Sequence, residues 1–217
     1  RGLFFCWVAL AVFLGGQGGV AAKERRAAMM VGNSAYEHIA ELKNPKNDAA
    51  DVAAQFRRLG FEVVESYDAD KRALERAIRS FAQSLSGADV GIFYYAGHGL
   101  QVGGQNYLVP VDAKLDDASG LDFEMVRLDL IHRTMEREAK TNVLFIDACR
   151  DNPLARNLAR AMGTRSGGVG RGLAAIESGV GTLISFSTQP GNVALDGAGA
   201  PSARGGPAPR RIPGPGT

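Results

Sequence analysis

Two apolar segments each lead to a side chain that can take part in nucleophilic or acid–base chemistry. The segment Val90–Gly99 reads VGIFYYAGHG and contains His98, and Val143–Pro153 reads VLFIDACRDNP and contains Cys149. A thiolate attacks a peptide carbonyl, while a neighbouring imidazole stabilises the thiolate and later protonates the leaving amine. His98 and Cys149 are therefore the candidate catalytic pair. Taken one at a time, they are better explained as a loop histidine and a buried core thiol; their joint position at matched strand ends favours the catalytic interpretation.

The backbone beside this pair is suited to bind a developing negative charge. Gly99 follows His98 directly, and because it has no Cβ its N–H group can approach a substrate carbonyl closely. We expect the backbone N–H groups of Gly99 and Cys149 to form an oxyanion hole.

The elements that must position the pair alternate between strand and helix. We expect five strands, at Ala27–Val31, Phe61–Glu65, Asp89–Tyr95, Asn142–Asp147 and Thr182–Ser187, and three helices, at Asp48–Leu59, Asp70–Leu85 and Asp129–Lys140. This order predicts an α/β fold with a mostly parallel sheet and helices on both faces. Active groups of such sheets lie beyond the carboxyl ends of the strands, so His98 and Cys149 are expected to meet there. The segment Leu100–Pro110, with Gly103 and Gly104, predicts a hairpin or flap.

The two segments together resemble the caspase-like cysteine peptidases. Ala148-Cys149-Arg150 matches the Q-A-C-[RQG]-G pattern of caspases, whose histidine lies about fifty residues upstream. Asp147 and Asp151 replace the Gln and the final Gly of that pattern, which points away from the animal caspases that cleave after Asp. The motifs GNSAY, NDA and STQPG are similar to those of the bacterial metacaspase and paracaspase branch. The resemblance covers residues 26–197.

The resemblance implies a three-layer α/β/α sandwich with a six-stranded, mostly parallel sheet whose last strand is antiparallel. Five strands are visible in this sequence, and a segment rich in Gly, Ala, Pro and Arg follows Asp196 in place of an apolar one. We therefore expect the last strand to be missing. The open sheet edge would then allow self-association with a second copy of the chain.

The resemblance also implies cleavage after Arg or Lys. In the metacaspase and paracaspase branch, the acidic residue two positions before the nucleophile lines the pocket for a basic P1 side chain, and Asp147 occupies that position. Asp48 and Asp196 match the other acidic pocket positions. Paired carboxylates bind a guanidinium well, often through two parallel hydrogen bonds. Asp48 is equally compatible with a helix N-cap.

A glycine-rich segment after the nucleophile is a candidate for self-cleavage. Residues 163–172 read GTRSGGVGRG, a composition typical of flexible, exposed chain, and they include Arg165 and Arg171. Caspase-like enzymes are often processed in this region, so we expect cleavage at these two arginines.

The chain divides into three parts. Residues 1–22 are expected to be a signal peptide, because the apolar run Leu3–Leu14 is followed by small residues ending at Ala22; a buried core helix is the alternative. Residues 23–196 are the expected catalytic domain, and residues 197–217 an expected disordered tail. Signal removal would take away Cys6 and leave Cys149 as the single cysteine. The mature protein is expected to be exported, to the periplasm or beyond, and to retain no stable membrane span.

Several other classes of function receive little support. A net charge of +2 gives no reason to expect nucleic acid, and the glycines near His98 lack the Lys-Ser/Thr of a phosphate-binding loop. His38 and His132 are expected to be surface residues, with no metal and no cofactor. Calcium activation stays open, but the acidic residues Asp112, Asp116, Asp117 and Asp122 do not have EF-hand spacing. The main alternative to a peptidase of peptide and protein substrates is a catalytically weak or inactive caspase-like module used for binding or signalling.

Overall fold

The computed structural model describes residues 23–117, 119–149, 154, 158, 169–170 and 173–187. The predicted signal peptide, the predicted tail and the region expected to lack a last strand all lie outside the described residues. Within the described part of the chain, no helix has the length and apolar character needed to cross a bilayer.

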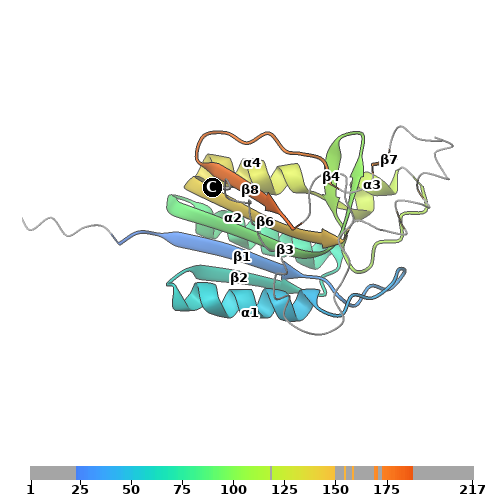
Figure 1. Ribbon diagram of the computed structural model, residues 1–217, viewed down its shortest axis with the longest axis horizontal. Helices are drawn as coiled ribbons and strands as arrows, with labels where there is room; N and C mark the ends of the chain where they lie inside the picture. The colour runs from blue at the N-terminus through green and yellow to red at the C-terminus, as the bar shows by residue number, and fades with distance from the viewer. Residues whose placement is uncertain are drawn as a thin grey trace, which may run out of the picture.

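A parallel sheet forms the centre of the molecule (Figure 1). Its strands run in the order β2-β1-β3-β6-β8, and every neighbouring pair is parallel. Their bounds are β1 Arg26–Gly32, β2 Glu62–Tyr67, β3 Ala88–Val102, β6 Ala139–Cys149 and β8 Thr182–Phe186. Each predicted strand is present, so the mostly parallel sheet is confirmed.

The strand β3 extends well beyond its predicted end at Tyr95. It passes through His98 and ends at Val102. Gly103 and Gly104, with φ angles of 56° and 83°, form the turn into β4 (Gln105–Leu108). β3 and β4 are antiparallel, which confirms the predicted hairpin. Two short strands enlarge this antiparallel region: β5 (Val126–Arg127) pairs with β4, and β7 (Val169–Gly170) pairs with β3.

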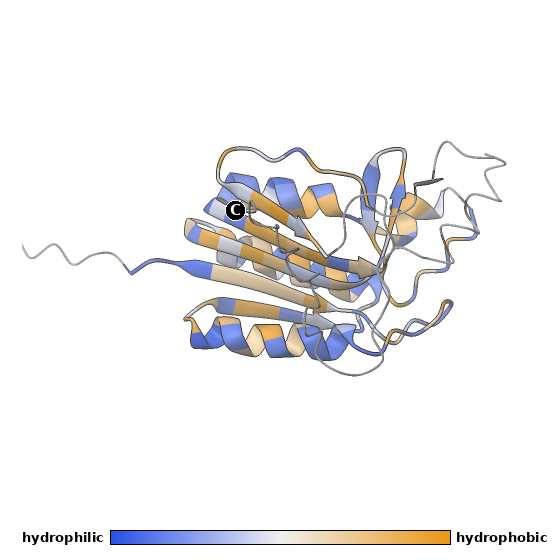
Figure 2. Cartoon of the chain, in the orientation of Figure 1, coloured by the Kyte–Doolittle hydropathy of each residue, from blue (hydrophilic) through white to orange (hydrophobic). Residues whose placement is uncertain are grey.

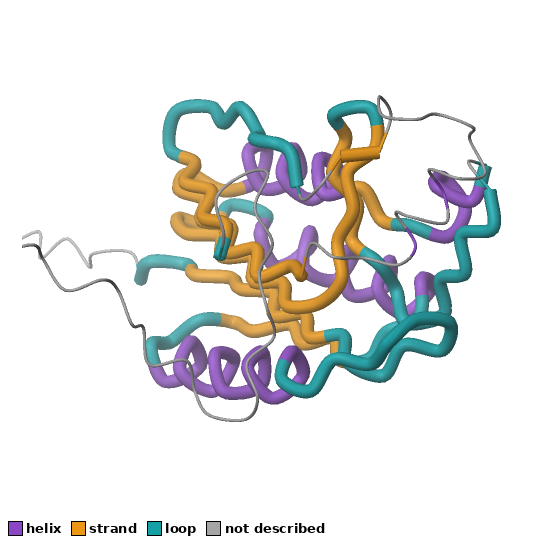
Figure 3. The backbone as a smooth tube through the Cα atoms, turned by 45° about the vertical axis from the view of Figure 1, so that its right-hand side comes forward, coloured by secondary structure: helices purple, strands orange, loops and turns teal. Residues whose placement is uncertain are grey.

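Helices cover both faces of the sheet (Figure 3). Helix α1 (Pro45–Arg58) packs on one face, and α2 (Lys71–Leu85) and α4 (Leu128–Glu138) pack on the other. Side chains of β1 alternate accordingly: Met29 faces α2 and α4, whereas Met30 faces α1. Figure 2 shows hydrophobic residues along the central strands and both kinds of residue on the helices. The structure is therefore an α/β/α sandwich, as predicted.

The first residues of α2 were predicted correctly from the sequence, and those of α1 were not. Asp70 is the N-cap of α2, and its side chain accepts a hydrogen bond from the Ala73 N–H at 2.6 Å. The interpretation of Asp48 as the N-cap of α1 is wrong, because the helix begins earlier, at Pro45, with Asn44 as its N-cap. Proline suits the first helical position since its φ is already fixed near the helical value. Asp48 lies inside the first turn.

A second hydrophobic cluster lies beyond the carboxyl ends of the parallel strands. It joins the loop after β1, the β3–β4 hairpin and the segment around α3 (Gly120–Glu124). Its buried members include Tyr36, Leu100, Val109 and Leu121. This cluster gives the edge of the sheet that holds His98 a packed, apolar environment.

Candidate active site

The register of two strands brings the candidate catalytic residues together. β3 and β6 pair from Ala88 with Ala139 to His98 with Cys149, so His98 and Cys149 are Cα partners. Adjacent strands of a sheet lie about 4.8 Å apart. The structure therefore places the two residues side by side, at the carboxyl end of the parallel strands, where the sequence predicted them.

The imidazole of His98 is buried and held by the loop that follows β1. Its Nε2 atom lies 3.1 Å from the carbonyl oxygen of Ala40. The Tyr36 ring packs on it with 4.6 Å between ring centroids and a tilt of 56°. A carbonyl oxygen only accepts hydrogen bonds, so Nε2 is the protonated nitrogen in this contact and Nδ1 is the acceptor of the neutral ring. This arrangement selects one tautomer of His98.

Two tyrosine hydroxyls hold the backbone of His98. The His98 N–H donates to Tyr36 Oη at 2.7 Å, and Tyr95 Oη donates to the His98 carbonyl at 2.6 Å. Both rings are buried. A Cβ at Gly97 would lie 2.7 Å from Tyr36 Oη and 2.8 Å from Tyr95 Oη, so only glycine lets both hydroxyls approach. These two contacts explain why position 97, directly before His98, is a glycine.

Gly99 lies next to the pair, as predicted for an oxyanion-hole residue. A Cβ on Gly99 would lie 3.1 Å from Ala148 Cβ and 3.2 Å from Leu173 Cδ2. Close packing between β3 and β6 is therefore one reason for a glycine here, in addition to any role of its N–H group. The predicted oxyanion hole stays a prediction.

Two of the three predicted pocket carboxylates, Asp48 and Asp147, influence the ionisation of one phenol, that of Tyr94. Asp147, near the end of β6, and Asp48, in the first turn of α1, are both exposed. Burial raises the pKa of Tyr94, and the negative charges of Asp147 and Asp48 raise it further. Tyr94 packs on the α1 face of the sheet. Val143 also packs on that face, and because side chains alternate along a strand, Asp147 lies on the same side of β6 as Val143. Asp48 and Asp147 are therefore both on the α1 side of the sheet.

Other predicted site residues lie outside the described residues. Asp196, the third predicted pocket carboxylate, and the predicted cleavage positions Arg165 and Arg171 are among them. A cavity of about 550 Å³ lies between α2, α3 and α4, and its lining includes none of the predicted catalytic or pocket residues.

The prediction that His132 is a surface residue is wrong. It lies on α4, is only 5% exposed, and its Nε2 is 3.1 Å from Glu136 Oε1 one helical turn away. Glu136 in turn accepts a hydrogen bond from the Gly179 N–H at 2.9 Å. The pair therefore links α4 to the chain that leads into β8. His38 is exposed, as predicted.

Three of the acidic residues after β4 form hydrogen bonds or ion pairs within the fold. Asp112 accepts a hydrogen bond from the Lys71 N–H at 3.0 Å, Asp116 pairs with Lys114 at 2.8 Å, and Asp117 accepts from the Ser119 N–H at 2.8 Å. Among the described residues, no three His, Cys, Asp or Glu side chains are grouped to hold a metal ion. These carboxylates thus have structural partners within the fold.

Most of the residues that hold His98 are not evident from the sequence. Tyr36 lies within the GNSAY motif, and Tyr95 and Ala40 belong to no motif that predicts a role at the site. A buried tyrosine needs a hydrogen-bond partner, which is the one signal in YYAGHG that favours a role for Tyr95. No sequence pattern indicates a backbone contact such as that of Ala40.

The chain is similar to known proteins over most of its described length. The caspase-domain family model matches residues 25–205. The mucosa-associated lymphoid tissue lymphoma translocation protein 1 of Homo sapiens is 30% identical over 125 residues, which is 58% of this chain, and its Mus musculus homologue gives the same figures. The chain spans about 15% of the length of these curated relatives.

Two solved structures are similar to the chain at lower identity. A Geobacter sulfurreducens protein is 20% identical with a TM-score of 0.47, covering 61% of this chain and 53% of that one. The Drosophila initiator caspase Dronc is 12% identical with a TM-score of 0.49, covering 76% of this chain and 55% of that one. The family model matches most of the chain, including both strands that hold His98 and Cys149. The chain therefore belongs to the caspase-domain family of cysteine peptidases.

Proposed function

We propose that the chain is a cysteine endopeptidase in which His98 and Cys149 form the catalytic dyad. The observation that supports this most directly is the β3–β6 register, which makes the two residues Cα partners. The contact of His98 Nε2 with Ala40 supports it further, because it leaves Nδ1 as the nitrogen that exchanges a proton with the thiol.

The proposed reaction has two steps. The Cys149 thiolate attacks the peptide carbonyl carbon, and the N–H groups of Gly99 and Cys149 stabilise the oxyanion. The C–N bond then breaks, the His98 imidazolium gives its proton to the leaving amine, and a thioester remains. In the second step water attacks the thioester, and His98 accepts a proton from that water. The acid product leaves, and the thiolate–imidazolium pair is restored.

We propose that the enzyme cleaves after Arg or Lys. The position of Asp48 in the first turn of α1, and of Asp147 on the side of β6 that faces α1, supports a pocket with two carboxylates on that face. A guanidinium or ammonium bound there would be held by charge-assisted hydrogen bonds. Asp196 is the further carboxylate proposed for this pocket.

Changing Asp147 to Asn is expected to lower kcat/KM for P1 Arg and Lys substrates by about ten- to a hundredfold. Hydrogen bonds to charged groups contribute about 1.5–3 kcal/mol, which corresponds to that range. The measurement uses fluorogenic peptides that differ only at P1, with Arg, Lys or Asp, in the presence and absence of calcium. Asp51→Asn is the matched control, since Asp51 is an exposed carboxylate on the same helix as Asp48. A wild-type preference for P1 Asp would contradict the proposed specificity.

We also propose self-cleavage after Arg165 and Arg171. Both are basic P1 residues in a glycine-rich segment. The wild-type protein is expected to produce fragments ending at these positions, and Cys149→Ala to stay intact under the same conditions. Intact-mass analysis of both proteins over time makes this measurement. Fragmentation of Cys149→Ala at the rate of the wild type would rule self-cleavage out.

A further inference from the structure

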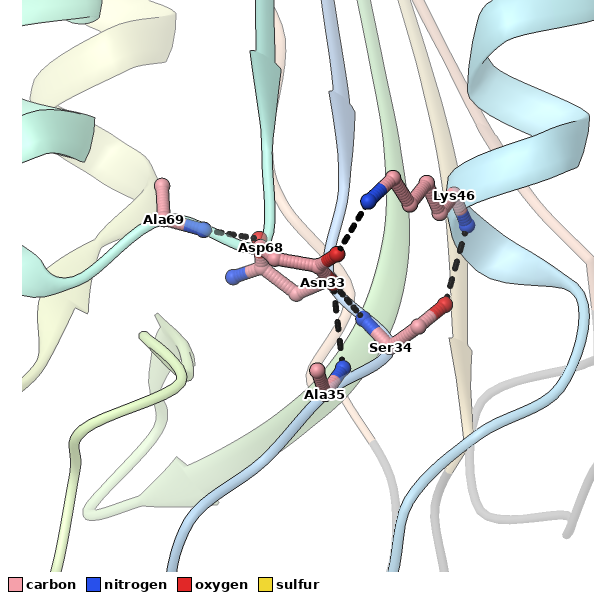
Figure 4. A network of polar contacts seen from close by, with 6 residues as sticks. All are labelled: Asn33, Ser34, Ala35, Lys46, Asp68 and Ala69. Atoms are coloured by element: carbon pink, nitrogen blue, oxygen red, sulfur yellow. Dashed lines mark hydrogen bonds and ion pairs between the residues drawn. The ribbon is translucent and has the colours of Figure 1, made fainter.

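A single carboxylate anchors the loop that holds His98. Asp68 follows β2, and its Oδ1 accepts hydrogen bonds from the Ser34 N–H at 2.8 Å and the Ala35 N–H at 3.0 Å. Its Oδ2 accepts from Lys46 Nζ at 2.8 Å (Figure 4). Ser34 and Ala35 begin the loop after β1, whereas Lys46 lies in the first turn of α1. Asp68 therefore joins the two ends of this loop.

Ser34 connects the residues held by Asp68 to the rest of the loop through hydrogen bonds. Its carbonyl accepts hydrogen bonds from the Tyr36 N–H at 3.1 Å and the Leu42 N–H at 3.0 Å. Its hydroxyl accepts from the Lys46 N–H at 3.1 Å. The segment that includes Tyr36 and Ala40 is thus closed on itself around Ser34. Fixing Ser34 fixes both groups that contact His98.

Asp68 is itself held in an uncommon conformation. Its φ is 45°, in the left-handed region that Asp and Asn adopt more readily than other non-glycine residues. Its N–H donates to the Gly32 carbonyl at 3.0 Å. Burial alone would raise the pKa of Asp68, but the hydrogen bonds from Lys46, Ala35 and Ser34 outweigh burial and lower it. The carboxylate is therefore ionised at neutral pH and available to all three donors.

We infer that Asp68 is a positioning residue for His98, acting through the loop Ser34–Lys46 without touching the imidazole. Its hydrogen bonds from the Ser34 and Ala35 N–H groups and from Lys46 fix both ends of the loop, and Ser34 holds the part of the loop where Tyr36 and Ala40 contact His98. This inference rests on the proposed function, because it assigns Asp68 a part in orienting the dyad.

The variant Asp68→Asn tests this inference with little change in shape. Asparagine tolerates a positive φ and keeps one acceptor oxygen, but it loses the charge and the ion pair with Lys46. Asp89→Asn is the matched control. Asp89 also accepts from a lysine, Lys140 Nζ at 2.7 Å, and from a backbone N–H, that of Arg25 at 2.9 Å, but it lies at the opposite end of β3.

The readout is the pH dependence of Cys149 alkylation by iodoacetamide, followed by mass analysis of the peptide that contains Cys149. An unpaired cysteine thiol has a pKa of about 8.5, and a thiolate paired with an imidazolium reacts at lower pH. In Asp68→Asn the profile is expected to shift toward that of an unpaired thiol. With a P1 Arg peptide, kcat is expected to fall about ten- to a hundredfold with a smaller change in KM, since small misplacements cost this much. Asp89→Asn should leave both measurements at wild-type values.

Urea unfolding of each variant separates positioning from loss of fold. If Asp68→Asn does not fold, Lys46→Met is the second variant, because it removes the ion pair and leaves both backbone bonds to Asp68; the same shift of smaller size is expected. An unchanged alkylation profile and kcat in the folded variant would overturn the inference. If His98→Ala instead has the same alkylation profile as the wild type, the proposed dyad itself fails, whatever Asp68 does.

Discussion

Replacing Cys149 by alanine is expected to abolish peptide hydrolysis, and replacing His98 by alanine to lower kcat/KM by about a thousandfold or more. Alanine at 149 removes the atom that forms the thioester, and alanine at 98 removes the group that activates the thiol and protonates the leaving amine. Members of a catalytic unit have strongly non-additive effects, so the double variant should be no slower than Cys149→Ala. The measurement is kcat/KM on a P1 Arg fluorogenic peptide.

The control for these variants is His38→Ala. His38 lies on the same loop as Tyr36 and Ala40, but its side chain is exposed, and activity should stay within about twofold of the wild type since surface changes have small effects. Hydrolysis that persists undiminished in purified Cys149→Ala would contradict the proposed dyad. A wild-type protein that neither turns over peptides nor labels at Cys149 with a basic peptide halomethyl ketone would favour the binding module instead.

Much of the fold could be predicted because the strands are short and apolar and are separated by amphipathic helices. That order predicts that the carboxyl ends of β3 and β6 share one edge of the sheet, whereas their exact register is seen only in the structure. The continuity of β3 could not be predicted in the same way. Residues Gly97–Gly99 separate the predicted strand from the predicted hairpin, and they are part of one strand because β4 and β6 supply hydrogen-bonding partners from distant parts of the chain. Strand formation there depends on tertiary context.

The candidate catalytic pair is easier to identify from the sequence than the residues that hold His98. His98 and Cys149 stand out because few other residue types can do their chemistry. Asp68 looks like an ordinary loop residue, and its role depends on Ser34 and Lys46 being brought to it by the folded chain. His132 was misplaced for a similar reason, since its burial results from packing between α4 and the sheet.

Helix α1 lies so close to the end of β1 that glycine at position 32 is a requirement of the fold. A Cβ there would lie 2.4 Å from the Pro45 carbonyl oxygen, 2.8 Å from Lys46 Cα and 2.8 Å from Ala49 Cβ. Two of these atoms belong to the backbone of the first turn of α1, so the clash cannot be relieved by rotating a side chain. The helix as a whole would have to move away from the sheet.

Gly32→Ala is therefore expected to lower the free energy of unfolding by about 3 kcal/mol, at the upper end of the usual cost of overpacking. For a domain of this size the melting temperature should fall by about 6–12 °C. Gly179→Ala is the matched control, because among the described residues its Cβ would meet only the Glu136 side chain, with Oε1 at 3.1 Å and Cδ at 3.8 Å; its effect should stay at about 0.5 kcal/mol. Urea and thermal unfolding measure both variants. Equal unfolding midpoints for the two variants would contradict the close packing of α1 against the end of β1. Because the displaced turn includes Lys46, which pairs with Asp68, the folded fraction of Gly32→Ala should also react more slowly at Cys149.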